Sequence, residues 1–187
     1  ALNRGFDVTA VVRGENKAEA HNVITKDIFD LTAEDLKGFD AVVDAFGVHD
    51  PDKFDQHTTT LHHLSDLLSG SDTRLLVVGG AGSLFTNPEH TAVLSEGFPE
   101  EFKGIPVAMG KALDALRKRD DVRWTYISPA ANFIPDGKRT GTYVVAGDEY
   151  TTNEEGVSEI SYADYAVAVI DEIEHGNHIH ERISLRW

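Results

Sequence analysis

The stretch Arg74-Leu-Leu-Val-Val-Gly79-Gly-Ala-Gly82-Ser83-Leu84 decides the fold class of this chain. It begins with an apolar run and ends in small residues and a hydroxyl group. Such a run is typical of a strand that is buried on both faces of a parallel sheet. Glycines just after the strand would let a ligand approach the backbone, and ligands of open α/β sheets bind at this edge. The alternative is an ordinary glycine turn after a buried strand.

The rest of the chain alternates between strand and helix patterns. Gly5 has the position of a left-handed glycine that ends a helix. Strands are predicted at residues 7–13, 22–25, 40–46, 122–127, 142–145 and 183–186. Helices are predicted at residues 17–21, from residue 32, at residues 50–70 and 107–119, and from residue 161 to about 174. This alternation predicts an α/β fold with a mostly parallel sheet. We expect a single domain over residues 1–187, with a small substrate-side portion at about residues 129–160.

Composition excludes several classes of function. The chain has 187 residues, of which 41% are hydrophobic, so it can bury a sizeable core. It has no cysteine, which excludes disulfides and thiolate metal sites and fits a reducing compartment. A net charge of −15 argues against nucleic acid as a partner. No apolar run approaches the length of a membrane span. We therefore expect a cytoplasmic protein, monomeric or homodimeric, whose partner is a small-molecule substrate.

Several short motifs, taken together in order, resemble one family. They are the strand at residues 7–13, Lys26-Asp27-Ile28, Ala45-Phe46-Gly47, Gly79–Ser83, Ser128-Pro129-Ala130 and Ile160-Ser161-Tyr162-Ala163-Asp164. In this order and spacing they resemble the atypical short-chain dehydrogenases/reductases of the NmrA-like and NADH-flavin reductase type. The resemblance covers essentially the whole chain. It implies a Rossmann-like three-layer fold with a mostly parallel sheet, and NADP or NAD as the cofactor.

The chain departs from this family at its beginning. Members start with a strand, a glycine-rich loop G-x-x-G-x-x-G that holds the cofactor's pyrophosphate, and a helix. The end of that helix resembles residues 1–6, but the strand and the loop do not precede it here. The absent strand would lie between the strands at residues 7–12 and 40–45. Either the protein extends further before Ala1, or the sheet is rearranged or completed by another chain; we expect the first.

The resemblance assigns cofactor contacts to the ends of the strands. Arg13 ends the second family strand, where an arginine can pair with the 2′-phosphate of NADP, which favours NADP over NAD. Asp27 would accept a hydrogen bond from the adenine amino group, and the backbone amide of Ile28 would donate to the ring. The alternatives are a solvated arginine and a turn-capping aspartate. The remaining cofactor contacts are assigned to Ala45, Phe46, Gly47, Gly79, Gly80, Pro129 and Ala130.

Candidate catalytic residues are Ser83 and Lys111. Ser83 lies where short-chain dehydrogenases place a hydroxyl group, and Lys111 is the candidate lysine that would contact the ribose. Four residues before Lys111 stands Val107, where the family's alcohol dehydrogenases carry a tyrosine. A phenol therefore cannot act as general acid at that position. For Lys111 the alternative is an ordinary surface lysine on a helix.

Reduction of a flavin or quinone asks less of the protein, because the nicotinamide delivers the hydride and water can supply the proton. Phe85, Asn132 and Phe133 could line a slot for such an acceptor, with a flavin as one candidate; for both phenylalanines the alternative is core packing. We therefore predict an NAD(P)H-dependent reductase of a small conjugated acceptor. The alternative is a non-catalytic NAD(P)-binding regulatory protein, with a sugar-nucleotide epimerase less favoured. The histidines have no metal-ligand spacing, so no metal site is predicted.

Overall fold

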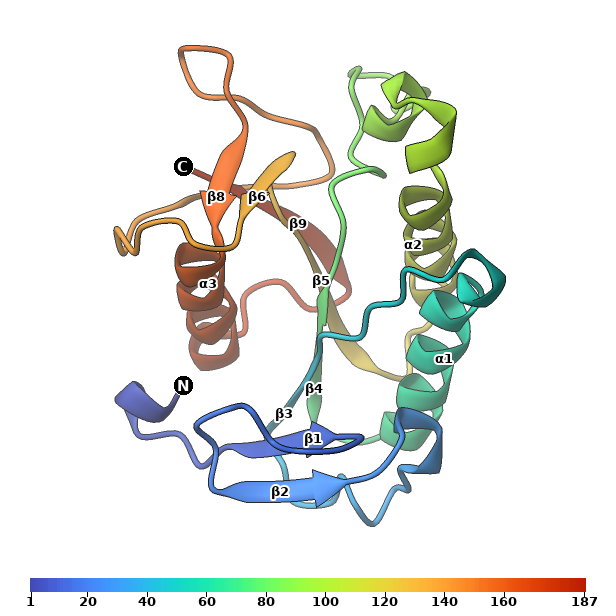
Figure 1. Ribbon diagram of the computed structural model, residues 1–187, viewed down its shortest axis with the longest axis vertical. Helices are drawn as coiled ribbons and strands as arrows, with labels where there is room; N and C mark the ends of the chain where they lie inside the picture. The colour runs from blue at the N-terminus through green and yellow to red at the C-terminus, as the bar shows by residue number, and fades with distance from the viewer. The chain divides into compact units, whose positions relative to one another are not determined.

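The computed structural model describes residues 1–187, which divide into two compact units, residues 1–38 and residues 39–187 (Figure 1). The first unit holds a short 3₁₀ helix, Leu2–Arg4, closed by Gly5 in the left-handed conformation that the sequence predicts. Strand β1 (Thr9–Val12) pairs in parallel with β2 (Asn22–Thr25), and a second 3₁₀ helix covers Ile28–Asp30. The prediction of one domain over residues 1–187 stays a prediction.

Two helices predicted in the first unit do not form. At residues 17–21 the side chain of Asn16 accepts from the amide of Ala18 and donates to the carbonyl of Ala20, so it takes backbone groups that a helix would need. At residue 32 the predicted cap does form, because Thr32 and Asp35 exchange hydrogen bonds. Only turns follow this cap, since the chain reaches a left-handed glycine at Gly38 (φ 84°) after about one helical turn.

The second unit is built on a five-stranded sheet in the order β3-β4-β5-β9-β7. Its strands are β3 (Ala41–Asp44), β4 (Arg74–Val78), β5 (Arg123–Ser128), β9 (Glu181–Arg186) and β7 (Val144–Ala146). The first four are parallel, and only β7 runs antiparallel to its neighbour. The predicted α/β fold with a mostly parallel sheet is therefore confirmed. A separate parallel pair, β6 (Asn132–Ile134) with β8 (Glu159–Ser161), was not predicted.

Strands β1 and β3 each lie at the edge of a sheet. Strand β1 pairs only with β2, and β3 pairs only with β4.

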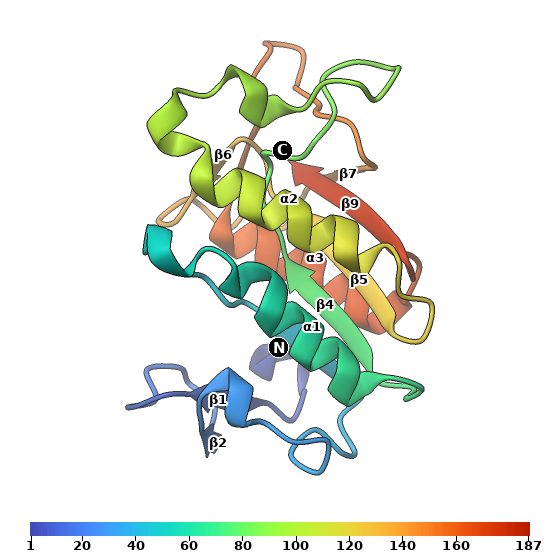
Figure 2. The same cartoon turned by 90° about the vertical axis from the view of Figure 1, so that its right-hand side faces the viewer.

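Helices cover both faces of the five-stranded sheet, so the second unit has three layers (Figures 1 and 2). Helices α1 (Gln56–Leu68) and α2 (Gly104–Leu116) lie side by side on one face, and α3 (Tyr162–His175) lies on the other. Short 3₁₀ helices cover Pro51–Lys53, Leu94–Gly97 and Glu100–Phe102. Helix α2 begins three residues before its predicted start, because Pro106 is tolerated in a first turn. None of the helices has the length and apolar character needed to cross a membrane.

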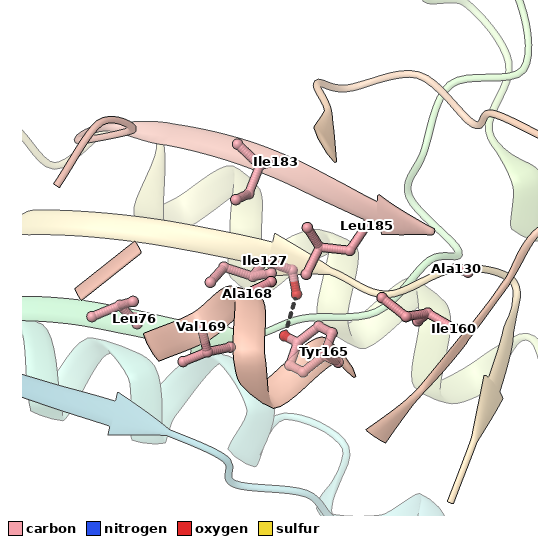
Figure 3. Close-up of a cluster of buried hydrophobic side chains, with 9 residues drawn as sticks. All are labelled: Leu76, Ile127, Ala130, Ile160, Tyr165, Ala168, Val169, Ile183 and Leu185. Atoms are coloured by element: carbon pink, nitrogen blue, oxygen red, sulfur yellow. Dashed lines mark hydrogen bonds between the residues drawn. The ribbon is translucent and has the colours of Figure 1, made fainter. Parts of the chain in front are cut away.

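Alternation along β4 supplies a core to each face. Leu76 points to the face of α3, where it joins Ile127, Ile183, Leu185 and the helix residues Tyr165, Ala168 and Val169 (Figure 3). The hydroxyl of Tyr165 donates to the carbonyl of Ile127 at 2.7 Å, so this buried phenol is satisfied. The core holds the strands rigid up to their carboxyl ends.

Candidate functional site

The carboxyl ends of three parallel strands lie next to one another in residues 39–187. Asp44 at the end of β3 pairs with Val77 of β4, and Val78 pairs with Ile127 of β5. The segments that follow these strands therefore leave the sheet at one edge. They carry eight of the predicted site residues, Ala45, Phe46, Gly47, Gly79, Gly80, Ser83, Pro129 and Ala130. Their roles toward a cofactor stay predictions.

The glycine after β4 is required by a tyrosine. A Cβ atom at Gly79 would lie 2.1 Å from Cε1 of Tyr126, a distance that no side chain can keep. The Tyr126 hydroxyl accepts a hydrogen bond from the amide of Gly80 at 3.3 Å. Burial raises the pKa of Tyr126 to about 12. The phenol is thus a neutral support beneath the loop, and close packing alone explains Gly79.

One stripe of helix α2 holds the loop after β4 from the other side. Cβ atoms at Gly80 and Gly82 would lie 3.1 Å from Sδ of Met109 and 2.5 Å from Cβ of Pro106. A Cβ at Gly110 would lie 3.6 Å from that of Ser83. Because Pro106, Met109 and Gly110 are three and four residues apart, they share one helix face.

The predicted lysine lies outside this stripe. Lys111 follows Gly110 on α2, its side chain is exposed, and no hydrogen bond or ion pair engages it. Val107, one turn earlier on the same side of the helix, is 45% exposed. The lysine therefore borders the loop without being bound to any protein group.

Asp44, at the end of β3, is a buried carboxyl group. It accepts from the amide of Phe46 at 2.9 Å, and burial raises its pKa. His57 of α1 packs its ring edge-on to Phe46 at 5.8 Å, and its Nε2 lies 3.2 Å from the carbonyl oxygen of Val48. The cavity among Asp44, His57 and Tyr126 measures about 20 Å³, which is room for a single water molecule. It is too small to hold a nucleotide.

A buried arginine that sequence reasoning missed holds Ser83. Arg182 of β9 donates to the hydroxyl and the carbonyl oxygen of Ser83, both at 3.1 Å. It also donates to Ser128 at 3.4 Å and to the carboxylate of Asp148 at 2.6 Å. Burial would raise the pKa of Asp148, but Arg182 and Arg117 outweigh it and keep the pKa below its usual value. No signal in the sequence links these five residues, since β9 is far from Ser83 along the chain.

The first unit carries the predicted adenosine contacts. Arg13, directly after β1, is exposed and has no hydrogen-bond or ionic partner. Asp27 accepts from the amide of Phe29 at 3.0 Å and so caps the 3₁₀ helix Ile28–Asp30. Asp27 therefore has the turn-capping role that was the alternative to an adenine contact. The Arg13 side chain remains available to a ligand.

The predicted substrate residues lie in two places. Phe133 of β6 packs against Tyr162 and Tyr165 of α3, with ring centroids 4.1 and 4.8 Å apart. Asn132, beside it, donates to Glu159 at 3.2 Å. Phe85 instead stacks on His90 at 4.3 Å, in the loop after β4.

The three histidines near the end of the chain turn to different partners. His175 Nδ1 lies 2.8 Å from the carbonyl of Asp171, and His180 Nε2 lies 2.7 Å from that of Val122. His178 binds the carboxylate of Glu172 at 2.7 Å. Nowhere do three metal-ligating side chains gather closely enough to hold an ion.

Residues 1–173 match the sequence pattern of a known family, described as NAD(P)H-binding. The chain belongs to this NAD(P)H-binding family. The match extends over nearly all of the chain, as the resemblance of its strand-end motifs predicts. In open α/β sheets, ligands generally bind in the crevice outside the carboxyl ends of the strands.

Known members are close to this chain along almost its whole length. The chain is 46% identical to the uncharacterized protein YwnB of Bacillus subtilis, covering 99% of this chain and 89% of YwnB. The crystal structure of SP1627 from Streptococcus pneumoniae, named a "putative NADH-flavin reductase", is 51% identical with a TM-score of 0.96, covering 99% of this chain and 89% of SP1627. A "putative epimerase" from Bacteroides thetaiotaomicron is 38% identical with a TM-score of 0.86, covering 100% of this chain and 88% of its own. These likenesses confirm the family that the sequence indicates.

Proposed function

We propose that the protein is an NAD(P)H-dependent reductase of a small conjugated acceptor, such as a flavin or a quinone. The observation that carries this proposal is the pair Val107 and Lys111 on α2. Where alcohol dehydrogenases of this type need a tyrosine four residues before the lysine, an exposed valine stands here. A conjugated ring that takes its proton from water does not need that phenol. The name of SP1627 supports the same class of reaction.

The residues at the strand ends fit the nicotinamide end of the cofactor. A Cβ at Gly47 would have no neighbour within 4 Å, and both Ala45 and Gly47 are exposed. A flat ring and its ribose therefore have space against this backbone. The bound cofactor supplies a hydride at its nicotinamide ring. The protein's own task is to hold the two rings close and in register.

Ser83 is the residue that we assign to the acceptor. Its oxygen receives a hydrogen bond from Arg182, so the hydroxyl proton remains free to be donated outward. A hydroxyl in this state suits a carbonyl or ring nitrogen that gains negative charge as it is reduced. Lys111, which has no protein partner, is assigned to the cofactor's ribose.

By the family resemblance, Arg13, Asp27 and Ile28 of the first unit are assigned to the adenosine part of the cofactor. Arg13, exposed and unpaired after β1, would bind the 2′-phosphate of NADP. The carboxylate of Asp27 and the amide of Ile28 would meet the adenine ring. This assignment favours NADPH over NADH.

The test is oxidation of NADPH and of NADH by the purified protein with riboflavin, FMN or a soluble quinone. We expect turnover that needs an acceptor, with a lower KM for NADPH. Cofactor binding without turnover on any of these acceptors would contradict the proposal. It would favour the second candidate, a non-catalytic NAD(P)-binding regulatory protein, which Val107 also permits.

A further inference from the structure

A loop after β6 is held rigidly against the start of helix α3. This loop, residues 135–142, receives a hydrogen bond on the carbonyl of Lys138 from the Ser161 hydroxyl at 2.7 Å. The amides of Thr140 and Gly141 donate to the Asp164 carboxylate at 3.0 and 2.8 Å. Burial would raise the pKa of Asp164, but these hydrogen bonds outweigh it, so the carboxylate stays charged. A loop bound in this way presents its outward side chains in fixed positions.

The outward side chains of this loop are cations. Lys138 and Arg139 are both exposed, and neither side chain has a hydrogen-bond or ionic partner in the protein. Asp136 is the one carboxylate of the loop, and no bond joins it to either cation. The chain carries 17 Lys and Arg against 32 Asp and Glu, so two adjacent cations without an acidic partner differ from a surface that is acidic on average. They form a local positive site on a protein whose net charge is negative.

An aromatic surface adjoins these cations. Tyr162 directly follows Ser161, whose hydroxyl donates to the Lys138 carbonyl. The backbone of Tyr162 therefore lies next to the loop. The Tyr162 ring is packed against Phe133 with centroids 4.1 Å apart, yet Tyr162 remains 49% exposed. Phe133 belongs to β6, whose first residue comes four positions after the last residue of β5. β6, which carries Phe133, runs beside β8, and β8 leads directly into α3, whose first residue is Tyr162 (Figure 1).

We propose that the acceptor of this reductase carries a phosphate, which Lys138 and Arg139 bind while its flat ring lies on Tyr162. The inference rests on the proposed reductase function and narrows its substrate class from conjugated acceptors in general to phosphorylated ones. Two cations attract a dianion more than a neutral sugar alcohol, and an exposed phenol offers a face on which a ring can stack. A neutral acceptor would gain only the stacking.

The first experiment compares FMN with riboflavin, which share the ring and differ in the phosphate. Binding is followed by quenching of flavin fluorescence on titration with the protein, without any nicotinamide cofactor. We expect FMN to bind about five- to tenfold more tightly than riboflavin at low salt, the effect of two exposed charge contacts. Inorganic phosphate, added alone as a competitor, should displace FMN and leave riboflavin bound.

Variants separate the two parts of the site. Lys138→Gln and Arg139→Gln should each weaken FMN binding about two- to threefold and leave riboflavin unchanged. Lys118→Gln, an exposed and unpaired lysine at the end of α2, is the matched control for loss of one charge and should change neither. Tyr162→Leu should weaken both flavins, whereas Tyr162→Phe, which keeps the ring, should restore both.

Three results would overturn the inference. They are equal affinities for FMN and riboflavin, an effect of Lys118→Gln as large as that of Lys138→Gln, or loss of NADPH binding rather than FMN binding in the loop variants. Failure of the reductase proposal would look different, because FMN would still bind through its phosphate while no acceptor oxidised NAD(P)H. Turnover with equal KM values for FMN and riboflavin would overturn the phosphate site alone.

Discussion

Arg182 donates to both the hydroxyl and the carbonyl oxygen of Ser83, although 99 residues separate the two in the sequence. Its third nitrogen, Nε, donates to Asp148, and the side chain is 1% exposed. Burial lowers the pKa of Arg182, but the Asp148 carboxylate beside it favours the charged guanidinium. The position of Ser83 at the strand ends therefore depends on the Arg182 guanidinium of β9. Asp148, which lies in a separate loop, holds this guanidinium in place.

We expect Arg182→Met to lower the free energy of unfolding by about 2–4 kcal/mol, because Asp148 and Ser83 lose their buried donor. Arg117 still pairs with Asp148, which limits the loss. Ser83→Ala, which removes one acceptor only, should cost about 1 kcal/mol. Urea unfolding of both variants measures this. Equal stability of the two variants would mean that Arg182 does not hold the loop.

Gly79 and Gly47 both follow a strand, yet substitution should affect them differently. Gly79→Ala forces the Tyr126 ring to move, so we expect a loss of about 1–3 kcal/mol in the free energy of unfolding. Gly47→Ala enters open space and should change stability by less than about 0.5 kcal/mol. Thermal unfolding of the pair tests this, and a Gly79→Ala variant as stable as the parent would show that the tyrosine yields easily.

Replacing Arg13 should alter the choice of cofactor without altering the fold. The side chain is exposed and unpaired, so Arg13→Gln should leave stability within about 0.5 kcal/mol. The ratio of affinities for NADPH and NADH should fall about tenfold, because a charge-assisted contact to the 2′-phosphate is lost. Calorimetric titration with both cofactors measures the ratio. Lys17→Gln, another exposed cation of the same unit, is the control and should leave it unchanged.

Much of the fold could be predicted from local patterns. The apolar and aromatic residues at β3, β4 and β5 are numerous enough to indicate buried strands, and Ser161 with Asp164 marks the start of α3. β6 escaped prediction because three residues, Asn132–Ile134, are too few to show a period. The helix predicted at residues 17–21 was wrong because the Asn16 side chain competes for the backbone, a choice that composition does not show.

The candidate site could be predicted only in outline. The end of a strand and the glycines after it can be recognised in a sequence, and from them Ser83 and Gly79 could be predicted as site residues. Their physical reasons were not visible, since Arg182 and Tyr126 are brought to them by the pairing of distant strands. A residue's neighbours across a parallel sheet are set by tertiary packing and leave no local pattern.

A buried cluster at the opposite end of the strands should make stability depend on pH. Arg74 binds Glu172 at 2.9 Å, and His178 binds the same carboxylate at 2.7 Å. Burial would raise the pKa of Glu172, but the hydrogen bonds from His178 and Arg74 outweigh it and hold the pKa below 4.5. The carboxylate thus stabilises the fold above pH 4.5, and this contribution is lost as the pH falls through the lowered pKa.

Glu172→Gln tests this cluster, because it leaves the Arg74 charge buried without a counter-ion. We expect a loss of about 3–5 kcal/mol at neutral pH. The difference between parent and variant should shrink as the pH falls from 4.5 through the lowered pKa of Glu172, where the parent's own carboxylate becomes protonated. Urea unfolding across this range measures it. A difference independent of pH would show that the Glu172 charge contributes nothing.

The contact between Gly79 and Tyr126 has a consequence for protein engineering and for natural variation. The Tyr126 ring occupies the space that a side chain at position 79 would need. The sizes of the side chains at positions 79 and 126 are therefore linked, because both must fit into the same space between neighbouring strands. A library that varies either position alone should yield few folded clones. One that varies both together should recover pairs in which a larger residue at 79 faces a smaller one at 126. Homologous chains should show the same reciprocal substitution.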